Sequence, residues 1–166
     1  MIRILCLLLL LIPVSAFPFQ NEPDGFRNIA WDAPFTHMAG FRPDGTADGP
    51  VKRYMKMDET FMFEGVTLSD IHYVAFDDKF VEAVLEFDCG EYGSINKMLK
   101  KKYGTATTAR KGSMSWWGKV TTITLGPPAA ATAKTPSPKT EPTLCSLTYS
   151  STTYLSKKAP PQKGKP

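Results

Sequence analysis

Histidine and cysteine are scarce in this chain of 166 residues, which contains two histidines and three cysteines. The histidines, His37 and His72, are far apart in sequence, and the cysteines do not have the spacing of a metal site. A glycine-rich phosphate loop is also missing, because Gly90 and Gly93 stand without the rest of such a pattern. We therefore expect no bound metal and no cofactor, and no residue is a candidate for catalysis.

Long apolar runs are missing too, apart from one at the start of the chain. Residues 1–3 give a short positive start, residues 4–12 are apolar, and residues 14–16 are the small residues that a signal peptidase reads. This order is typical of a secretory signal peptide, and the run is shorter than the roughly 20 residues of a membrane-spanning helix. We predict that residues 1–16 are removed and that the mature protein, beginning at Phe17, is periplasmic or secreted and has no transmembrane segment.

An excess of charge of one sign is absent from the part that is expected to fold. Residues 17–126 carry 13 Lys and Arg against 15 Asp and Glu, whereas residues 127–166 carry six lysines and one glutamate. The formal net charge of +4 therefore comes from the ends of the chain. We expect no nucleic-acid partner, because such a partner requires a basic face.

What is present is the material for one domain. Apolar residues alternate with a period of two, which predicts strands over residues 54–57, 60–63, 71–76, 79–87, 113–117, 120–125 and 144–149. Residues 92–103 change to a helical period and end at Gly104, which predicts the main helix. The expected fold class is α+β: a single, mainly antiparallel sheet of about five to seven strands, with this helix packed on one face.

Two segments of biased composition lie outside this pattern. Residues 126–143 are rich in proline, alanine and threonine and are predicted to be a low-complexity loop, while residues 157–166 are predicted to be a disordered basic tail. The expected organisation is a signal peptide, a single domain over residues 17–156, and this tail.

Two cysteines, Cys89 and Cys145, remain after removal of the signal peptide. An even pair in an exported chain favours a disulfide, and both residues fall on strand faces that point into the core. We predict a Cys89–Cys145 bridge; two separate buried thiols are the alternative.

Several short motifs occur in a particular order: Gly25 to Trp31 (GFRNIAW), Ile71 to Phe76 (IHYVAF), Lys102 to Gly104 (KYG) and Trp116 to Gly118 (WWG). In this order the chain, over about residues 25–150, resembles a group of small exported bacterial proteins with GFRGIKWG, IEYVF, KYG and WWG motifs. Asp32-Ala33, where glycine is usual, and the long loop depart from the group. The resemblance implies export and the fold, and it implies no activity.

The residue types that most often act in catalysis, histidine and the acids, each have a structural interpretation in this sequence. A hairpin turn at Asp77-Asp78 would pair His72 with Ala83 and place it on an apolar face, which favours a satisfied, partly buried histidine over a functional one. The strand acids, Glu82, Glu86 and Asp88, alternate with apolar residues and are typical of a solvated sheet face.

The aromatic residues carry the candidate binding site. The same hairpin register would leave Tyr73, Phe80 and Val84 on the sheet face away from the helix, which is more apolar than a solvent face should be. Trp117 should stand on that face, because it and Trp116 point in opposite directions and Trp116 should enter the core. The alternative is that the N-terminal segment covers this face.

Two functions of different classes follow from these features. The preferred hypothesis is an exported, non-enzymatic envelope protein that binds a protein, peptide or glycan through a sheet face, with Trp117, Tyr73, Phe80 and Val84 as the binding residues. The rival hypothesis is a small hydrolase that acts on cell-wall or extracellular polymer through strand carboxylates. An enzyme would need a concave pocket with convergent polar groups.

Overall fold

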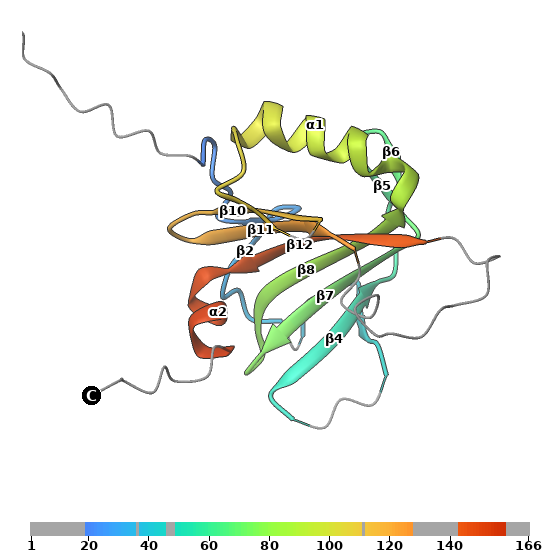
Figure 1. The fold of residues 1–166 in the computed structure, drawn as a ribbon. Coiled ribbons are helices and arrows are strands. Elements are labelled where there is room, and N and C mark those ends of the chain that lie inside the picture. The colour runs from blue at the N-terminus through green and yellow to red at the C-terminus, as the bar shows by residue number, and fades with distance from the viewer. Residues whose placement is uncertain (1–18, 36, 46–48, 111, 128–142, 159–166) are drawn as a thin grey trace, which may run out of the picture.

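The computed structural model describes residues 19–35, 37–45, 49–110, 112–127 and 143–158. Its centre is an eight-stranded antiparallel sheet with the order β3-β4-β7-β8-β12-β11-β10-β9 (Figure 1). The strands of this sheet are β3 (Phe41–Pro43), β4 (Val51–Lys56), β7 (Asp70–Phe76), β8 (Lys79–Asp88), β9 (Thr108–Arg110), β10 (Ser113–Trp117), β11 (Thr121–Gly126) and β12 (Leu144–Ser151). Two small hairpins, β1 (Gly25–Phe26) with β2 (Ile29–Ala30) and β5 (Met62–Phe63) with β6 (Val66–Thr67), complete the strands.

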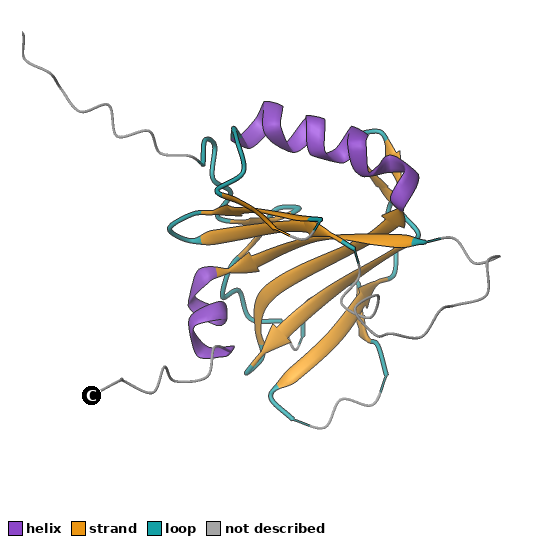
Figure 2. Ribbon diagram, viewed as in Figure 1, coloured by secondary structure: helices purple, strands orange, loops and turns teal. Residues whose placement is uncertain are grey.

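The two helices lie on opposite faces of the sheet (Figure 2). After a short 3₁₀ turn, η1 (Cys89–Glu91), helix α1 (Tyr92–Tyr103) buries Ile95, Leu99 and Tyr103 in the main core. Helix α2 (Thr152–Lys158) buries Tyr154 against a smaller cluster on the other face. The α+β class and the main helix at residues 92–103 are thus confirmed, while the sheet is larger than predicted and α2 was not predicted.

The central hairpin, β7–β8, contains a β-bulge that corrects the predicted register. Asp77 and Asp78 form the predicted turn, both with positive φ, and Phe76 pairs with Lys79. Between Ala75–Phe80 and Val74–Glu82 the register shifts by one residue, so that Val81 is the extra residue. His72 therefore pairs with Val84 rather than with Ala83, and every residue of β7 before the bulge faces the side opposite to the one predicted.

The predicted hairpin at Asp58-Glu59 is not formed. β4 pairs with β3 and β7, and β5 turns back through Glu64-Gly65 to pair with β6 instead. Glu59 has a buried side chain, 3 % exposed, in an ion pair with Arg27. An acid that the sequence places in a solvated turn thus lies in the interior.

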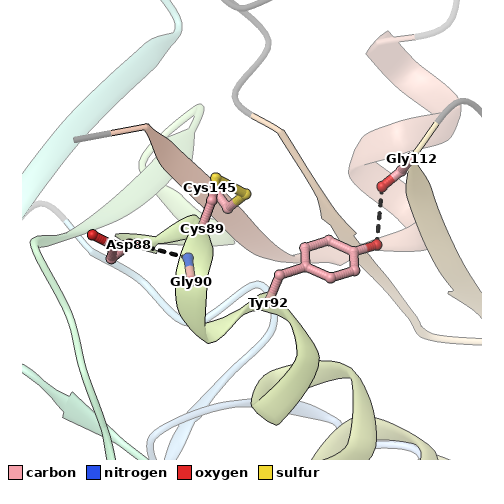
Figure 3. The surroundings of a disulfide bond; sticks show 6 residues. All are labelled: Asp88, Cys89, Gly90, Tyr92, Gly112 and Cys145. Carbon is pink, nitrogen blue, oxygen red and sulfur yellow. Dashed lines mark hydrogen bonds between the residues drawn. A yellow bond between two sulfur atoms is a disulfide. The ribbon is translucent and has the colours of Figure 1, made fainter. Parts of the chain in front are cut away.

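A disulfide joins Cys89 to Cys145, with a Cα–Cα distance of 4.9 Å (Figure 3). It links the residue after β8 to β12, next to the start of α1. The backbone around it is held by the Asp88 carboxylate, which accepts a hydrogen bond from the Gly90 N–H at 2.7 Å. The predicted cysteine pairing is confirmed.

Several predictions fall on parts of the chain outside the described residues. These are the signal peptide, the start of the mature protein at Phe17, most of the loop at 126–143 and residues 159–166 of the tail. The first residue of the predicted loop, Gly126, belongs to β11, and β12 begins at Leu144, directly after the predicted end of the loop. The first two residues of the predicted tail belong to α2.

Candidate ligand-binding face

The two adjacent tryptophans of β10 point to opposite sides of the sheet. Trp116 is fully buried, and its indole Nε1–H donates a hydrogen bond to the Gly104 carbonyl at 2.8 Å. Trp117 is 58 % exposed. The predicted division of the pair is therefore confirmed, although the turn is longer than predicted: Trp116 pairs with Ile123 and Trp117 with Thr122. A shift of two residues leaves each side chain on its predicted face.

The turn that follows Trp117 is held by the N-terminal segment. The Glu22 carboxylate accepts hydrogen bonds from the Val120 and Thr121 N–H groups, at 2.6 and 2.7 Å. The Gly118 N–H donates to the Thr121 carbonyl at 2.9 Å. A Cβ on Gly118 would lie 2.0 Å from Glu22 Oε1, so a larger residue here would displace the Glu22 carboxylate from the turn. Sequence reasoning missed Glu22, since the contact joins residues about a hundred positions apart.

A group of hydroxyl-bearing residues surrounds Trp117 on the side of the sheet away from α1. Register places Thr122 beside Trp117, and Thr124 between Ser115 and Thr148. Paired residues point to the same side of a sheet, so these side chains form one surface. We call the following set the hydroxyl face: Ser115, Trp117, Thr122, Thr124, Ser146 and Thr148. Except for Trp117, all of its members are half-buried.

The hydroxyl groups of this face are only partly satisfied within the described part of the chain. Ser115 and Thr124 lie within hydrogen-bond distance of each other, 3.3 Å. The side chains of Thr122, Ser146 and Thr148 make no hydrogen bond to any described residue. Three hydroxyls therefore remain able to bind water or a ligand.

Tyr73 and Phe80 do not stand on an open face, as the predicted register required. Both are fully buried in the main core, on the same face as α1. The N-terminal segment covers them: the Phe26 ring lies 6.1 Å from Tyr73, and the Trp31 ring stacks on Phe80 at 5.0 Å. The alternative interpretation placed this segment over the sheet face away from the helix, whereas the segment packs with Tyr73 and Phe80 in the core on the α1 side. The physical cause is the bulge at Val81, which turns Phe80 and Ala83 to the same side.

Val84 is half-buried and lies on the side of the sheet that carries the hydroxyl face, paired with Thr148 and His72. His72 is 8 % exposed. Its Nε2 lies 3.1 Å from Asp70 Oδ2, and its Nδ1 lies 3.4 Å from Asp44 Oδ2. The imidazole thus lies between two carboxylates, while its buried Nδ1 makes no hydrogen bond to any described residue.

The strand carboxylates are spread along β7 and β8. Glu82 accepts a hydrogen bond from the Ser150 hydroxyl at 2.8 Å. Glu86 pairs with Asp70 across β8 and β7. The Oδ1 atom of Asp70 accepts a hydrogen bond from the Ile71 N–H at 2.7 Å. Asp88, the third strand acid named from the sequence, lines one cavity together with Glu91, whereas Glu82, Glu86 and Asp70 do not line this cavity or the three others found among the described residues.

A buried polar cluster lies inside the main core, away from the hydroxyl face. The Glu59 carboxylate accepts hydrogen bonds from the Arg27 guanidinium and the Tyr73 hydroxyl, and its Oε1 also accepts the Thr60 N–H at 2.9 Å. Burial, followed by the hydrogen bond to Glu59, raises the pKa of Tyr73 well above its usual value. Because both carboxylate oxygens are engaged, Glu59 acts as a link between segments.

Three observations on the described residues concern metal binding, membrane insertion and the compartment. No group of three or more His, Cys, Asp or Glu side chains there is placed to hold a metal ion. Over the same residues, no helix is both long enough and apolar enough to cross a membrane. The disulfide fits an extracellular protein, because such bonds persist in oxidising compartments.

Comparison of the chain with protein-family models, with curated proteins and with solved structures finds no match. The resemblance to small exported bacterial proteins therefore stays a prediction, and any function has to be argued from the residues themselves.

Proposed function

We propose that this protein is an exported, non-enzymatic binding module that recognises a glycan of the cell envelope through the hydroxyl face. The observation that carries the proposal is the exposed indole of Trp117 beside half-buried, unsatisfied hydroxyls on the same sheet surface. A pyranose ring has an apolar C–H face and a rim of hydroxyls, so an indole can stack on the first while Thr and Ser bind the second.

The composition of the face favours a glycan over a protein partner. The centre of a protein interface is enriched in apolar residues, whereas Trp117 is the only large exposed apolar side chain of the hydroxyl face. The nearby carboxylates, Glu82 and Glu86, would repel an anionic polymer. A neutral glycan is therefore the class that fits.

Rigidity also supports a binding role for Trp117. Trp117 lies at the end of β10, which pairs with β11, and its backbone N–H donates a hydrogen bond to the Thr107 hydroxyl at 3.1 Å. The turn after it is fixed by Glu22. A backbone held in place before binding loses little entropy when a ligand arrives.

The hydrolase remains the second candidate because of one observation. Asp70 and Glu86 face each other across β7 and β8, and paired residues bring their Cβ atoms within about 5.5 Å, a spacing that can suit a retaining glycosidase. Against this, Asp70 already binds His72 and the Ile71 N–H, which leaves it poorly placed to act as a nucleophile.

The test is a titration of the oxidised protein with soluble neutral oligosaccharides, such as β-1,4-linked glucose and N-acetylglucosamine oligomers. Binding should change the tryptophan emission, because Trp117 is the most exposed of the indoles. Trp117→Ala should lower affinity by about tenfold or more, the effect expected of an aromatic anchor. Phe61→Ala serves as the matched control, since it removes a similarly exposed ring, 48 %, from another part of the surface.

Two outcomes would contradict the proposal. The first is that none of the oligosaccharides binds, or that Trp117→Ala binds as tightly as Phe61→Ala. The second is that the oligosaccharides are cleaved and that Glu86→Gln abolishes the cleavage, which would establish the hydrolase.

A further inference from the structure

A second candidate site lies where β4 and β7 separate. The two strands pair only from Val51–Phe76 to Tyr54–Tyr73. β4 then continues to Lys56 with β3 as its only partner. A cavity of about 370 Å³ opens at this point, with the buried Ile71 among its walls. This volume is at the small end of the range of about 300–1,000 Å³ that small-molecule sites occupy.

The cavity is lined by two cations for which the described residues supply no counter-ion. Arg42 and Lys56 both border it, and neither forms an ion pair or side-chain hydrogen bond with any described residue. Arg27, by contrast, is paired with Glu59. Cations that share a cavity without a counter-ion form a local positive field that attracts an anion.

The one acid in the cavity wall does not neutralise these cations. Glu59 lines the cavity, yet its two oxygens are taken by Arg27, Tyr73 and the Thr60 N–H. Its side chain is 3 % exposed, so little of the carboxylate reaches the open space. The charge available to a ligand is that of Arg42 and Lys56.

The rest of the wall is apolar and open to solvent. Phe61 is 48 % exposed and Met57 is 65 % exposed, and Met55, which precedes Lys56 on β4, pairs with Arg42 on β3. Exposed apolar groups that gather around a cavity are typical of a ligand site, and methionine side chains adapt to ligands of variable shape.

We propose that this cavity binds a small amphiphilic anion, a carboxylate that carries a short hydrocarbon chain. The carboxylate would enter the gap beside β7, which Arg42 and Lys56 border from opposite faces of the β3–β4 pair, so that each can form a charge-assisted hydrogen bond with it. The chain would pack on Met57 and Phe61. A free fatty acid and a single-chain lipid with an anionic head group share the general form of an anion on a hydrocarbon chain. The site is separate from the hydroxyl face and does not depend on the proposed glycan.

Isothermal titration of the full-length oxidised protein with sodium octanoate tests this inference. We expect saturable binding of one octanoate. 1-Octanol and sodium acetate should each bind at least tenfold more weakly, because 1-octanol lacks the carboxylate and acetate lacks the hydrocarbon chain. Arg42→Gln and Lys56→Gln should each weaken octanoate by about tenfold, the factor for loss of one charge-assisted hydrogen bond. Phe61→Ala should weaken it as well.

Lys101→Gln is the matched control, because it removes a cation from the exposed surface of α1, and its affinity should equal that of the unsubstituted protein. Thermal melting of every variant identifies loss of fold. The inference is overturned if octanoate does not saturate, if 1-octanol binds equally well, or if the folded Arg42→Gln and Lys56→Gln variants bind like Lys101→Gln. Comparison with an acylated glycerol phosphate then distinguishes a lipid source from a free acid.

Discussion

Replacing Glu59 by glutamine should lower the free energy of unfolding more than neutralising any charged residue on the surface. Glu59 joins three separate segments: its own loop, the turn that holds Arg27, and β7 through Tyr73. Arg27 extends the link, since its guanidinium also donates to the Met62 carbonyl at 2.7 Å. Glutamine has nearly the same shape, so the substitution removes charge and one acceptor without opening a cavity.

The magnitude follows from the burial of the pair. Removing one partner of a fully buried ion pair costs about 3–5 kcal/mol, because a buried charge is left alone. Here the Arg27 side chain is 22 % exposed and can recover some hydration. The amide oxygen of glutamine can satisfy Arg27 or the Tyr73 hydroxyl, and a hydrogen bond to a charged group contributes about 1.5–3 kcal/mol. We therefore expect a loss of about 2–3 kcal/mol.

Urea unfolding followed by tryptophan fluorescence measures this loss. The matched control is Glu64→Gln, which breaks the Glu64–Lys102 ion pair of 3.0 Å between side chains that are 44 and 45 % exposed. An exposed pair of this kind contributes at most about 1 kcal/mol. If Glu59→Gln and Glu64→Gln lower the free energy of unfolding equally, the buried cluster does not stabilise the fold and the reasoning is wrong.

Two further predictions concern the disulfide and alkaline pH. The Cys89–Cys145 bridge spans 56 residues, so the double alanine variant should lose about 4 kcal/mol in the chain-entropy model, measured by the same urea unfolding; an unchanged midpoint would contradict it. Burial raises the pKa of Tyr73 and Tyr149 above 10, so the unfolded chain releases these protons first. Stability should be constant below about pH 10 and fall above it, by up to about 1.4 kcal/mol per pH unit for each tyrosine. Tyr149→Phe should halve that slope, whereas an undiminished slope would assign the effect to other groups.

Apart from the Cys89–Cys145 bridge, the features that sequence reasoning predicted correctly are local ones. The helix over residues 92–103 follows from its period and from Gly104, whose positive φ of 83° glycine adopts readily. The opposite orientations of Trp116 and Trp117 follow from strand geometry alone, and they survive a turn of the wrong length. Each depends on neighbours within a few positions.

The features that were missed depend on contacts across the chain. Glu59 is an acid beside Asp58, a pair that is typical of a solvated turn, and only Arg27, 32 positions earlier, makes its burial possible. Glu22 binds the turn after Trp117 from 98 positions away. No periodicity records such partners, because each side chain is polar and unremarkable in its own segment.

The bulge at Val81 explains why the candidate site moved. A β-bulge has no simple sequence signature, since one extra residue leaves the alternation intact on either side of it. Without it, Phe80 and Ala83 would face opposite ways and Tyr73 would share the surface with the strand acids. With it, Phe80, Ala83 and Tyr73 all enter the core under the N-terminal segment. The surface left open lies over β10, β11 and β12. Apart from Trp117, the outward residues of its hydroxyl face are serine and threonine. Trp117 belongs to this surface in either register, and for that reason the proposed binding role rests on it.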